Sequence, residues 1–174
     1  EEARLIYAGV SHLQPTDASR LVVDIGGRST EMILGQGRTP LVAESFQVGS
    51  VSLSMRFFGN GRLSEQAFRA AQIAAGAELE EALQPFAPQR WQEALGSSGT
   101  VGAVSQLLAA NGVTDGRITP DGLRWCIAGC IQAGHTDKRP ARRVRRVARG
   151  GHHLRRRARQ RDAIRLAHLK AAAG

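Results

Sequence analysis

Cysteine and aromatic residues are scarce in this chain of 174 residues. The sequence contains two cysteines, and aromatic residues make up 5% of it. Two cysteines exclude the disulfide framework of a small secreted domain. The spacing of Cys126 and Cys130 fits neither a CxxC redox motif nor a zinc site. We expect both to be reduced thiols that pack as small core side chains.

Long hydrophobic runs are missing as well. No apolar run approaches the ~20 residues that span a bilayer, and no charged-then-apolar leader opens the sequence. These absences predict a cytoplasmic protein without a membrane span. The chain opens on EEARLIYAGV rather than on an initiator Met, so we expect it to be a fragment of a longer protein.

Acidic residues almost disappear after residue 137. Residues 138–174 contain fourteen basic side chains and one acidic one, Asp162, which gives a net charge of +13. Residues 1–137 contain ten basic and fourteen acidic side chains, a net charge of −4, and all eight aromatic residues. We therefore divide the sequence into one domain at 1–137 and an Arg-rich tail at 138–174. We expect the tail to be disordered or read out of frame.

Turn residues and apolar periodicity across residues 1–134 predict an α/β domain. Helices are expected from Ser64 towards Pro85, from Val101 to Asn111, and from Thr119 to Gly134. The segment 49–58 is ambiguous between strand and helix. Strands are expected at 21–25, 30–34, 40–47 and 91–95.

The first two expected strands are joined by Asp24-Ile25-Gly26-Gly27-Arg28-Ser29-Thr30. A buried strand ends near an acid, and glycine N–H groups and hydroxyls follow, which together suit the approach of an anion. No GK[ST] follows, so the segment is not a Walker A loop. A strand, a Gly-rich loop and a second strand are typical of phosphate-binding loops of the actin and Hsp70 type. A plain hairpin turn fits the spacing equally well.

A second Gly/Ser segment, Gly96-Ser97-Ser98-Gly99-Thr100, lies between an expected strand and an expected helix. Free N–H groups and the helix dipole favour anions at such a helix start, although a simple cap also explains the sequence. Two loops of this kind in one chain indicate phosphate binding more strongly than either does alone.

Five segments occur in a recognisable order: EEARLIYAGV, LVVDIGGRSTEMILG, ESFQVGSVSLSMRFF, GSSGT and ITPDGLRW. Together they resemble the exopolyphosphatase/guanosine pentaphosphate phosphohydrolase (Ppx/GppA phosphatase) family of the sugar kinase/actin/Hsp70 superfamily. The resemblance implies a ribonuclease-H-like lobe, a mixed sheet flanked by helices, over residues 1 to about 134. It also implies release of terminal orthophosphate from polyphosphate, or of the 5′ γ-phosphate from guanosine pentaphosphate, with Mg²⁺ or another divalent cation. The intact family would form homodimers.

The resemblance also implies roles for individual residues. Glu2 matches the family's catalytic glutamate, which activates the attacking water. Asp24 matches the acid that holds Mg²⁺, and Glu31 matches the acid after the loop, which we assign to the same metal. The implied phosphate-binding residues are Gly26, Gly27, Arg28, Ser29, Thr30, Gly96, Ser98, Gly99 and Thr100.

Each of these acids also has a simpler interpretation. Glu2 would ordinarily be a solvated charge, and Glu31 on a strand would face solvent. Asp24 would cap a turn.

The chain departs from the family pattern in three places. Arg28 stands where the family has a third glycine. If that position needs a positive φ, a side chain costs about 1–2 kcal/mol, and its bulk could keep phosphate away from the backbone. A guanidinium could instead bind a phosphate chain bidentately. Of these effects we favour impairment. The N-terminal half of the family's first lobe is absent, and the Arg-rich tail replaces an apolar strand and helix.

Two classes of function follow. The first is a phosphoanhydride hydrolase of the exopolyphosphatase type, with guanosine pentaphosphate as the alternative substrate. The second is an inactive fragment whose basic tail binds polyanions or nucleic acid, with a strong dependence on salt.

We hypothesise a frameshift near Lys138. A sudden loss of aromatic and acidic residues with a surge of Arg is typical of GC-rich coding sequence read out of frame. Nucleotide sequence across codons 134–142 tests this prediction. If neither shifted frame restores an apolar strand and helix around a glycine pair, the hypothesis fails.

Overall fold

The computed structural model describes residues 1–136 and the backbone of residues 164–166. Five strands form one sheet in the order β3-β2-β1-β4-β5. β1 runs parallel to β4, and every other neighbouring pair is antiparallel. The mixed α/β sheet expected from the sequence is therefore confirmed. The strands are β1 (Ser19–Ile25), β2 (Thr30–Gln36), β3 (Thr39–Phe46), β4 (Glu93–Gly96) and β5 (Ile164–Leu166).

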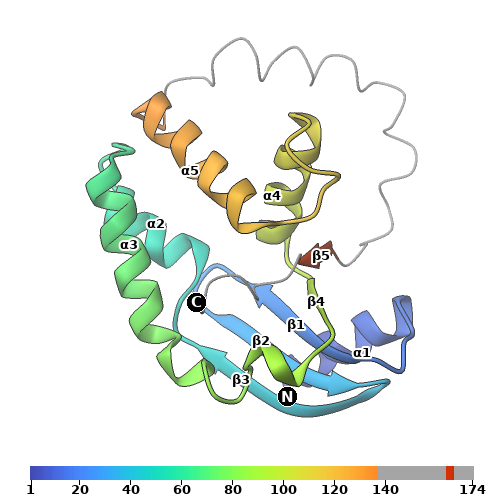
Figure 1. Ribbon diagram of the computed structural model, residues 1–174. Helices are drawn as coiled ribbons and strands as arrows, with labels where there is room; N and C mark the ends of the chain where they lie inside the picture. The colour runs from blue at the N-terminus through green and yellow to red at the C-terminus, as the bar shows by residue number, and fades with distance from the viewer. Residues whose placement is uncertain (137–163, 167–174) are drawn as a thin grey trace.

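Within residues 1–136, five α-helices flank the sheet. Figure 1 shows α2 and α3 along one side of it, α1 on the other, and α4 with α5 beyond the ends of β1 and β4. Two short 3₁₀ helices, Glu80–Ala82 and Pro88–Arg90, connect α3 to β4. The α-helices are α1 (Glu2–Leu13), α2 (Ser50–Phe58), α3 (Glu65–Glu78), α4 (Gly99–Ala110) and α5 (Pro120–Ala133).

Two of the helices begin at the side chains that the sequence predicts. The Ser64 and Thr119 hydroxyls accept from the N–H groups of Ala67 and Gly122, respectively. Pro120 occupies the first turn of α5, where its missing N–H costs nothing. The ambiguous segment 49–58 is largely the helix α2.

The helix expected to run from Ser64 towards Pro85 is shorter than predicted. It ends at Glu78, and a 3₁₀ turn follows. Ala82 of this turn and Phe86 after it are buried, whereas Leu83 between them is 73% exposed. The spacing of Leu79 and Leu83 predicted a longer helix. Burial of Ala82 and Phe86 in the core decides the local structure instead.

The two faces of the sheet carry separate cores. Leu21 and Leu34 pack with Phe86 and Trp91 on the side of α3. Val22, Ile33 and Leu95 pack with Tyr7 and Val10 of α1 on the other side. Side chains alternate between the two faces along a strand. Residues two positions from Val22 in β1 and from Ile33 in β2 therefore face α1 as well. Asp24 and Glu31 occupy such positions.

Cys126 and Cys130 are free thiols on α5, and both are half-buried. Burial raises the pKa of each thiol above its ordinary value, so both are poor nucleophiles at neutral pH. This agrees with the expected packing role. In the described part of the chain, no helix is both long and apolar enough to cross a bilayer.

The expectation for the tail at 138–174 falls outside the described residues, apart from the three residues of β5. There the backbone of Ile164–Leu166 pairs antiparallel with β4.

Gly35 on β2 tests the packing of α1 against the sheet. A Cβ at Gly35 would overlap the Tyr7 ring and lie 2.6 Å from the Thr39 carbonyl oxygen. We expect Gly35→Ala to lower the free energy of unfolding by about 1–3 kcal/mol, since overpacking forces α1 off the strand. Urea denaturation measures the change. Gly9→Ala in α1 is the control, because nothing lies within 4 Å of its Cβ. An unchanged stability for Gly35→Ala would contradict the close Tyr7 contact.

Candidate active site

The loop at 26–29 connects β1 to β2 as a tight hairpin. The Gly26 N–H donates to the Ser29 carbonyl oxygen at 2.9 Å. Among the described residues no non-glycine residue has a positive φ, and neither Gly26 nor Gly27 has one. Arg28 therefore sits in the loop without the backbone strain that a required positive φ would impose. The concern about strain at this position is corrected by the geometry.

The first turn of α2 holds the carbonyl groups of this loop. Gly26 O accepts from the Ser50 N–H at 2.9 Å and from the Ser50 hydroxyl at 3.0 Å. Gly27 O accepts from the N–H groups of Val51 and Ser52 at 2.9 and 3.0 Å. These helix-start N–H groups would otherwise have no partner within the helix. In the described chain, they hold the loop in place.

The N–H groups on the loop are left for another acceptor. Within residues 1–136, the N–H groups of Gly27, Arg28 and Ser29 donate to no protein acceptor. Consecutive backbone N–H groups without partners form a concave site for an anion. The loop thus has the donors that its sequence predicts.

Gly49, at the N-terminus of α2, is a residue to which the sequence gave no role. A Cβ there would lie 2.5 Å from Arg28 N and from Gly27 C. Only glycine lets the start of α2 come this close to the loop. The sequence does show a glycine just before Ser50 within ESFQVGSVSLSMRFF. The reason for this glycine is a contact with Gly27 and Arg28, which are too distant in sequence for a local pattern to reveal it.

The second Gly/Ser loop, at 96–100, lies next to the first. Ser98 caps α4 by accepting from the Val101 N–H at 3.2 Å. The Thr100 hydroxyl donates to the Ser50 hydroxyl at 3.3 Å, and Ser50 in turn donates to the first loop. A Cβ at Gly96 would overlap Val101, whereas a Cβ at Gly99 would meet nothing within 4 Å. Packing explains Gly96, whereas no described residue packs beside Gly99 within 4 Å.

Two carboxylates face each other across β1 and β2. Asp24 and Glu31 are paired in the strand register, which places directly opposite Cβ atoms about 4.5–5.5 Å apart. The Ser97 hydroxyl donates to Asp24 Oδ2 at 2.5 Å, and the Ser45 hydroxyl donates to Glu31 Oε1 at 3.0 Å. Glu31 is 6% exposed, so the solvent-facing interpretation is wrong. Sequence reasoning missed Ser97, whose role appears only when β4 lies beside β1.

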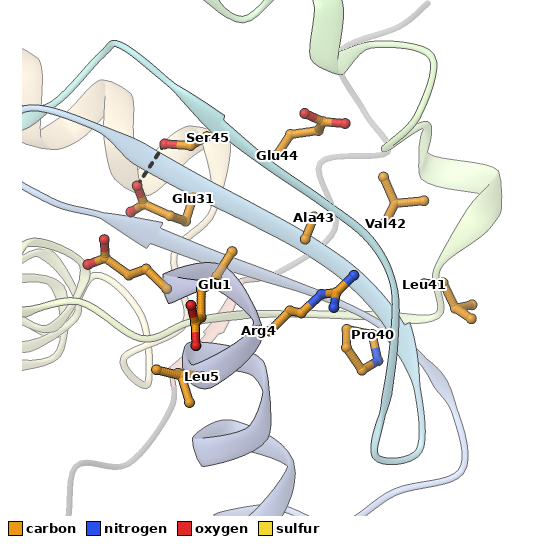
Figure 2. Close-up of a pocket in the computed structure, with 12 residues that line it drawn as sticks. Glu1, Arg4, Leu5, Glu31, Pro40, Leu41, Val42, Ala43, Glu44 and Ser45 are labelled. Carbon is orange, nitrogen blue, oxygen red and sulfur yellow. Dashed lines mark hydrogen bonds between the residues drawn. The ribbon is translucent and has the colours of Figure 1, made fainter.

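Glu2 and Glu31 line one cavity of about 740 Å³ between the start of α1 and the strands β2 and β3. Figure 2 shows Glu31 joined to Ser45, with Glu1 just before α1 and Arg4 on the first turn of this helix. The two Gly/Ser loops do not line this cavity. The second loop is linked to the cavity through two contacts: Ser97 donates to Asp24, and Asp24 lies opposite Glu31, which lines the cavity.

Thr30 differs from the other proposed phosphate ligands. Its hydroxyl donates to the Val48 carbonyl oxygen at 2.6 Å, and the residue is 6% exposed. Thr30 also follows the opposite face of β2 from Glu31, because adjacent strand residues alternate. In this arrangement its hydroxyl fastens β2 to the segment before α2.

The carboxylate oxygens of Asp24 and Glu31 are hard ligands of the kind that a divalent cation such as Mg²⁺ prefers. In the described residues there is no cluster of three or more His, Cys, Asp or Glu that could hold a metal ion. Mg²⁺ does not need one, since it commonly uses one or two carboxylates with water and substrate phosphate oxygens. The serine hydroxyls bond one oxygen of each carboxylate. The pair therefore fits Mg²⁺ as a partial ligand set.

The mixed sheet and its flanking helices define a ribonuclease-H-like α/β lobe. The chain belongs to the Ppx/GppA phosphatase family, whose family model matches residues 1–148. The family expected from the sequence motifs is confirmed, and the match extends past residue 134.

Individual relatives agree with this assignment. The chain is 44% identical over 134 residues to a Haemophilus influenzae protein named as a proposed exopolyphosphatase. It resembles the structure of the Aquifex aeolicus Ppx/GppA phosphatase with 26% identity and a TM-score of 0.53, over 61% of this chain and 34% of that one. A second Aquifex aeolicus PPX-GPPA structure, at 22% identity, has a TM-score of 0.62 over 83% of this chain and 50% of that one, and shows the fold alone.

The match with the Haemophilus influenzae protein covers 77% of this chain and 42% of the relative. The chain thus spans less than half the length of that curated protein.

Gly49 provides a test of how α2 holds the loop. We expect Gly49→Ala to push α2 away from the Gly27–Arg28 peptide and to lower the free energy of unfolding by about 1–3 kcal/mol. Amide hydrogen exchange at Ser50, Val51 and Ser52 should speed up with it. Gly76→Ala in α3 is the matched control, because nothing lies within 4 Å of its Cβ; alanine there should stabilise the helix by about 0.5–1 kcal/mol. Equal stability changes for the two variants would refute the close contact.

Proposed function

We propose that this chain contributes an active site for exopolyphosphatase-type hydrolysis, which releases terminal orthophosphate from inorganic polyphosphate. One observation carries the proposal: Glu2 and Glu31 line the same cavity, and Asp24 lies opposite Glu31 with a hydrogen bond to the second Gly/Ser loop. The name of the Haemophilus influenzae relative supports polyphosphate as the substrate class. Guanosine pentaphosphate carries the same type of anhydride bond and is the alternative to be tested beside it.

The phosphate chain would bind at the two Gly/Ser loops. The unpartnered N–H groups of Gly27 and Ser29 would donate to phosphate oxygens, with Gly26 allowing the tight turn that presents them. At the second loop, Gly99 and Thr100 form the first turn of α4, where free N–H groups and the helix dipole favour an anion. The space beside Gly99 supports this assignment, since no packing contact with a described residue accounts for the missing side chain.

Three residues support these phosphate ligands from within the protein. Ser98 fixes the start of α4 through its cap, Gly96 makes room for Val101, and Thr30 secures β2. Their hydrogen bonds and packing are satisfied inside the chain, so we assign them to shaping the site.

Asp24 and Glu31 would hold the divalent cation. When bound, Mg²⁺ would neutralise negative charge on the phosphate oxygens of the reacting group. Ser97 and Ser45 orient the two carboxylates through hydrogen bonds of 2.5 and 3.0 Å, which limits the rearrangement that ligation requires.

Glu2 would be the general base. Its exposed carboxylate, at the start of α1, opens on the cavity and can reach solvent water. Glu2 takes a proton from a water molecule as the water oxygen bonds to the terminal phosphorus. The phosphoanhydride P–O bond breaks, orthophosphate is released, and the shortened polyphosphate leaves with the bridging oxygen.

Glu2→Gln tests this role. We expect phosphate release from polyphosphate, measured with Mg²⁺ present, to fall about 10²–10⁴-fold, because glutamine cannot accept the proton. The matched control is Glu65→Gln, since Glu65 is the exposed first residue of α3 as Glu2 is of α1. The control should keep the starting rate.

Parallel assays with guanosine pentaphosphate decide between the two substrates. A chain that releases phosphate from neither substrate would overturn the proposal, as would Glu2→Gln with an unchanged rate on polyphosphate.

A further inference from the structure

Arg28 is a cation in the loop proposed to bind phosphate, at the position where the family pattern has glycine. Its backbone is compatible with a side chain, because φ at this position is not positive. A Cβ at Gly49, the residue just before α2, would lie 2.5 Å from the Arg28 N atom, so the backbone that carries the side chain lies against the start of this helix. The side chain itself is exposed.

The guanidinium has no ion pair or hydrogen bond within residues 1–136. Three other arginines of this part do have acidic partners: Arg20 with Glu93, Arg117 with Asp115, and Arg124 with Asp121. A cation that has no partner in this part of the chain remains available to a ligand.

The charges around the site make such a cation useful. Glu2, Asp24 and Glu31 repel a polyanion, and residues 1–137 carry a net charge of −4. Backbone N–H groups contribute only partial charges. A full positive charge beside them lowers the electrostatic cost of bringing several phosphates close to these carboxylates.

We propose that Arg28 is a substrate-binding residue that contacts a phosphate group of the polyphosphate chain, as an addition to the glycine loop of the family. The guanidinium donates two parallel N–H bonds to one phosphate, a geometry that an ammonium cannot reproduce. The inference rests on the proposed function, and it specifies the substrate as one with phosphates beyond the reacting group. The proposal opposes the impairment favoured from the sequence, and the binding experiment decides between them.

The test is direct binding of tripolyphosphate with Mg²⁺ by calorimetry across a series of salt concentrations. We expect Arg28→Gln to raise the Kd roughly tenfold or more, because a charge-assisted bidentate contact is lost. The slope of log Kd against log salt should decrease by about one, as expected when one cation–phosphate contact is removed. Arg28→Lys should keep the salt slope and still bind more weakly than the original chain.

Arg38→Gln is the matched control. Arg38 is also an exposed arginine in a hairpin turn, at the opposite end of β2, and its loss should leave both Kd and slope unchanged. Thermal unfolding of each variant shows that the fold is retained.

The results separate this inference from the proposed function. Binding that depends on Arg28 in a chain without phosphate release would sustain the inference and overturn the hydrolysis. If the chain releases phosphate and Arg28→Gln leaves the KM unchanged, the proposed hydrolysis stands and the inference about Arg28 fails. Tripolyphosphate that fails to bind the original chain, or binds Arg28→Gln as tightly or more tightly, overturns the inference.

Discussion

The arrangement of the candidate site depends on the hydrogen bonds between the first turn of α2 and the loop carbonyls of Gly26 and Gly27. These bonds satisfy both partners: the helix start gains acceptors for its unpaired N–H groups, and the loop gains donors for its carbonyls. Because the carbonyl groups of Gly26 and Gly27 point towards α2, the N–H groups of the following residues point in other directions. The helix therefore fixes the face of the loop on which, within residues 1–136, the N–H groups of Gly27, Arg28 and Ser29 remain without a protein acceptor. Gly49 permits this geometry, because any Cβ there would collide with the loop backbone.

The strand register contributes the second constraint. Pairing Asp24 with Glu31 places both carboxylates on the face of the sheet that α1 covers, and α1 brings Glu2 to the same side. A slip of one residue would turn Glu31 towards the α3 core and Thr30 towards α1. The apolar alternation prevents this slip, since Ile33 and Leu34 pack in different cores. Packing of uncharged residues thus fixes the position of the charged ones.

Much of this fold follows from local sequence, and much of the site does not. The caps at Ser64 and Thr119, the strand at 21–25 and the hairpin at 26–29 depend on neighbouring residues, so pattern and turn chemistry predict them. The segment 49–58 remained ambiguous because its apolar spacing suits both structures, and the contact with the loop is formed only in the folded chain. Ser97 and Gly49 escaped notice for the same reason: each acts on a residue more than 20 positions away. The hydrogen bond of Glu31 likewise depends on β3, because its partner Ser45 lies 14 positions away.

Arg28 shows how the sequence and the structure constrain each other. A family pattern alone makes the residue a defect, because glycine in a phosphate loop normally signals either a positive φ or close backbone approach. The structure separates these two requirements. No residue of the loop at 26–29 has a positive φ. The close approach is that of the start of α2 to the loop backbone, and Gly49 is the glycine that allows it. The side chain at position 28 can therefore extend into solvent without disturbing the loop. Because residues 1–137 carry a net charge of −4, a solvent-extended cation beside unpaired N–H groups increases their attraction for a polyanion.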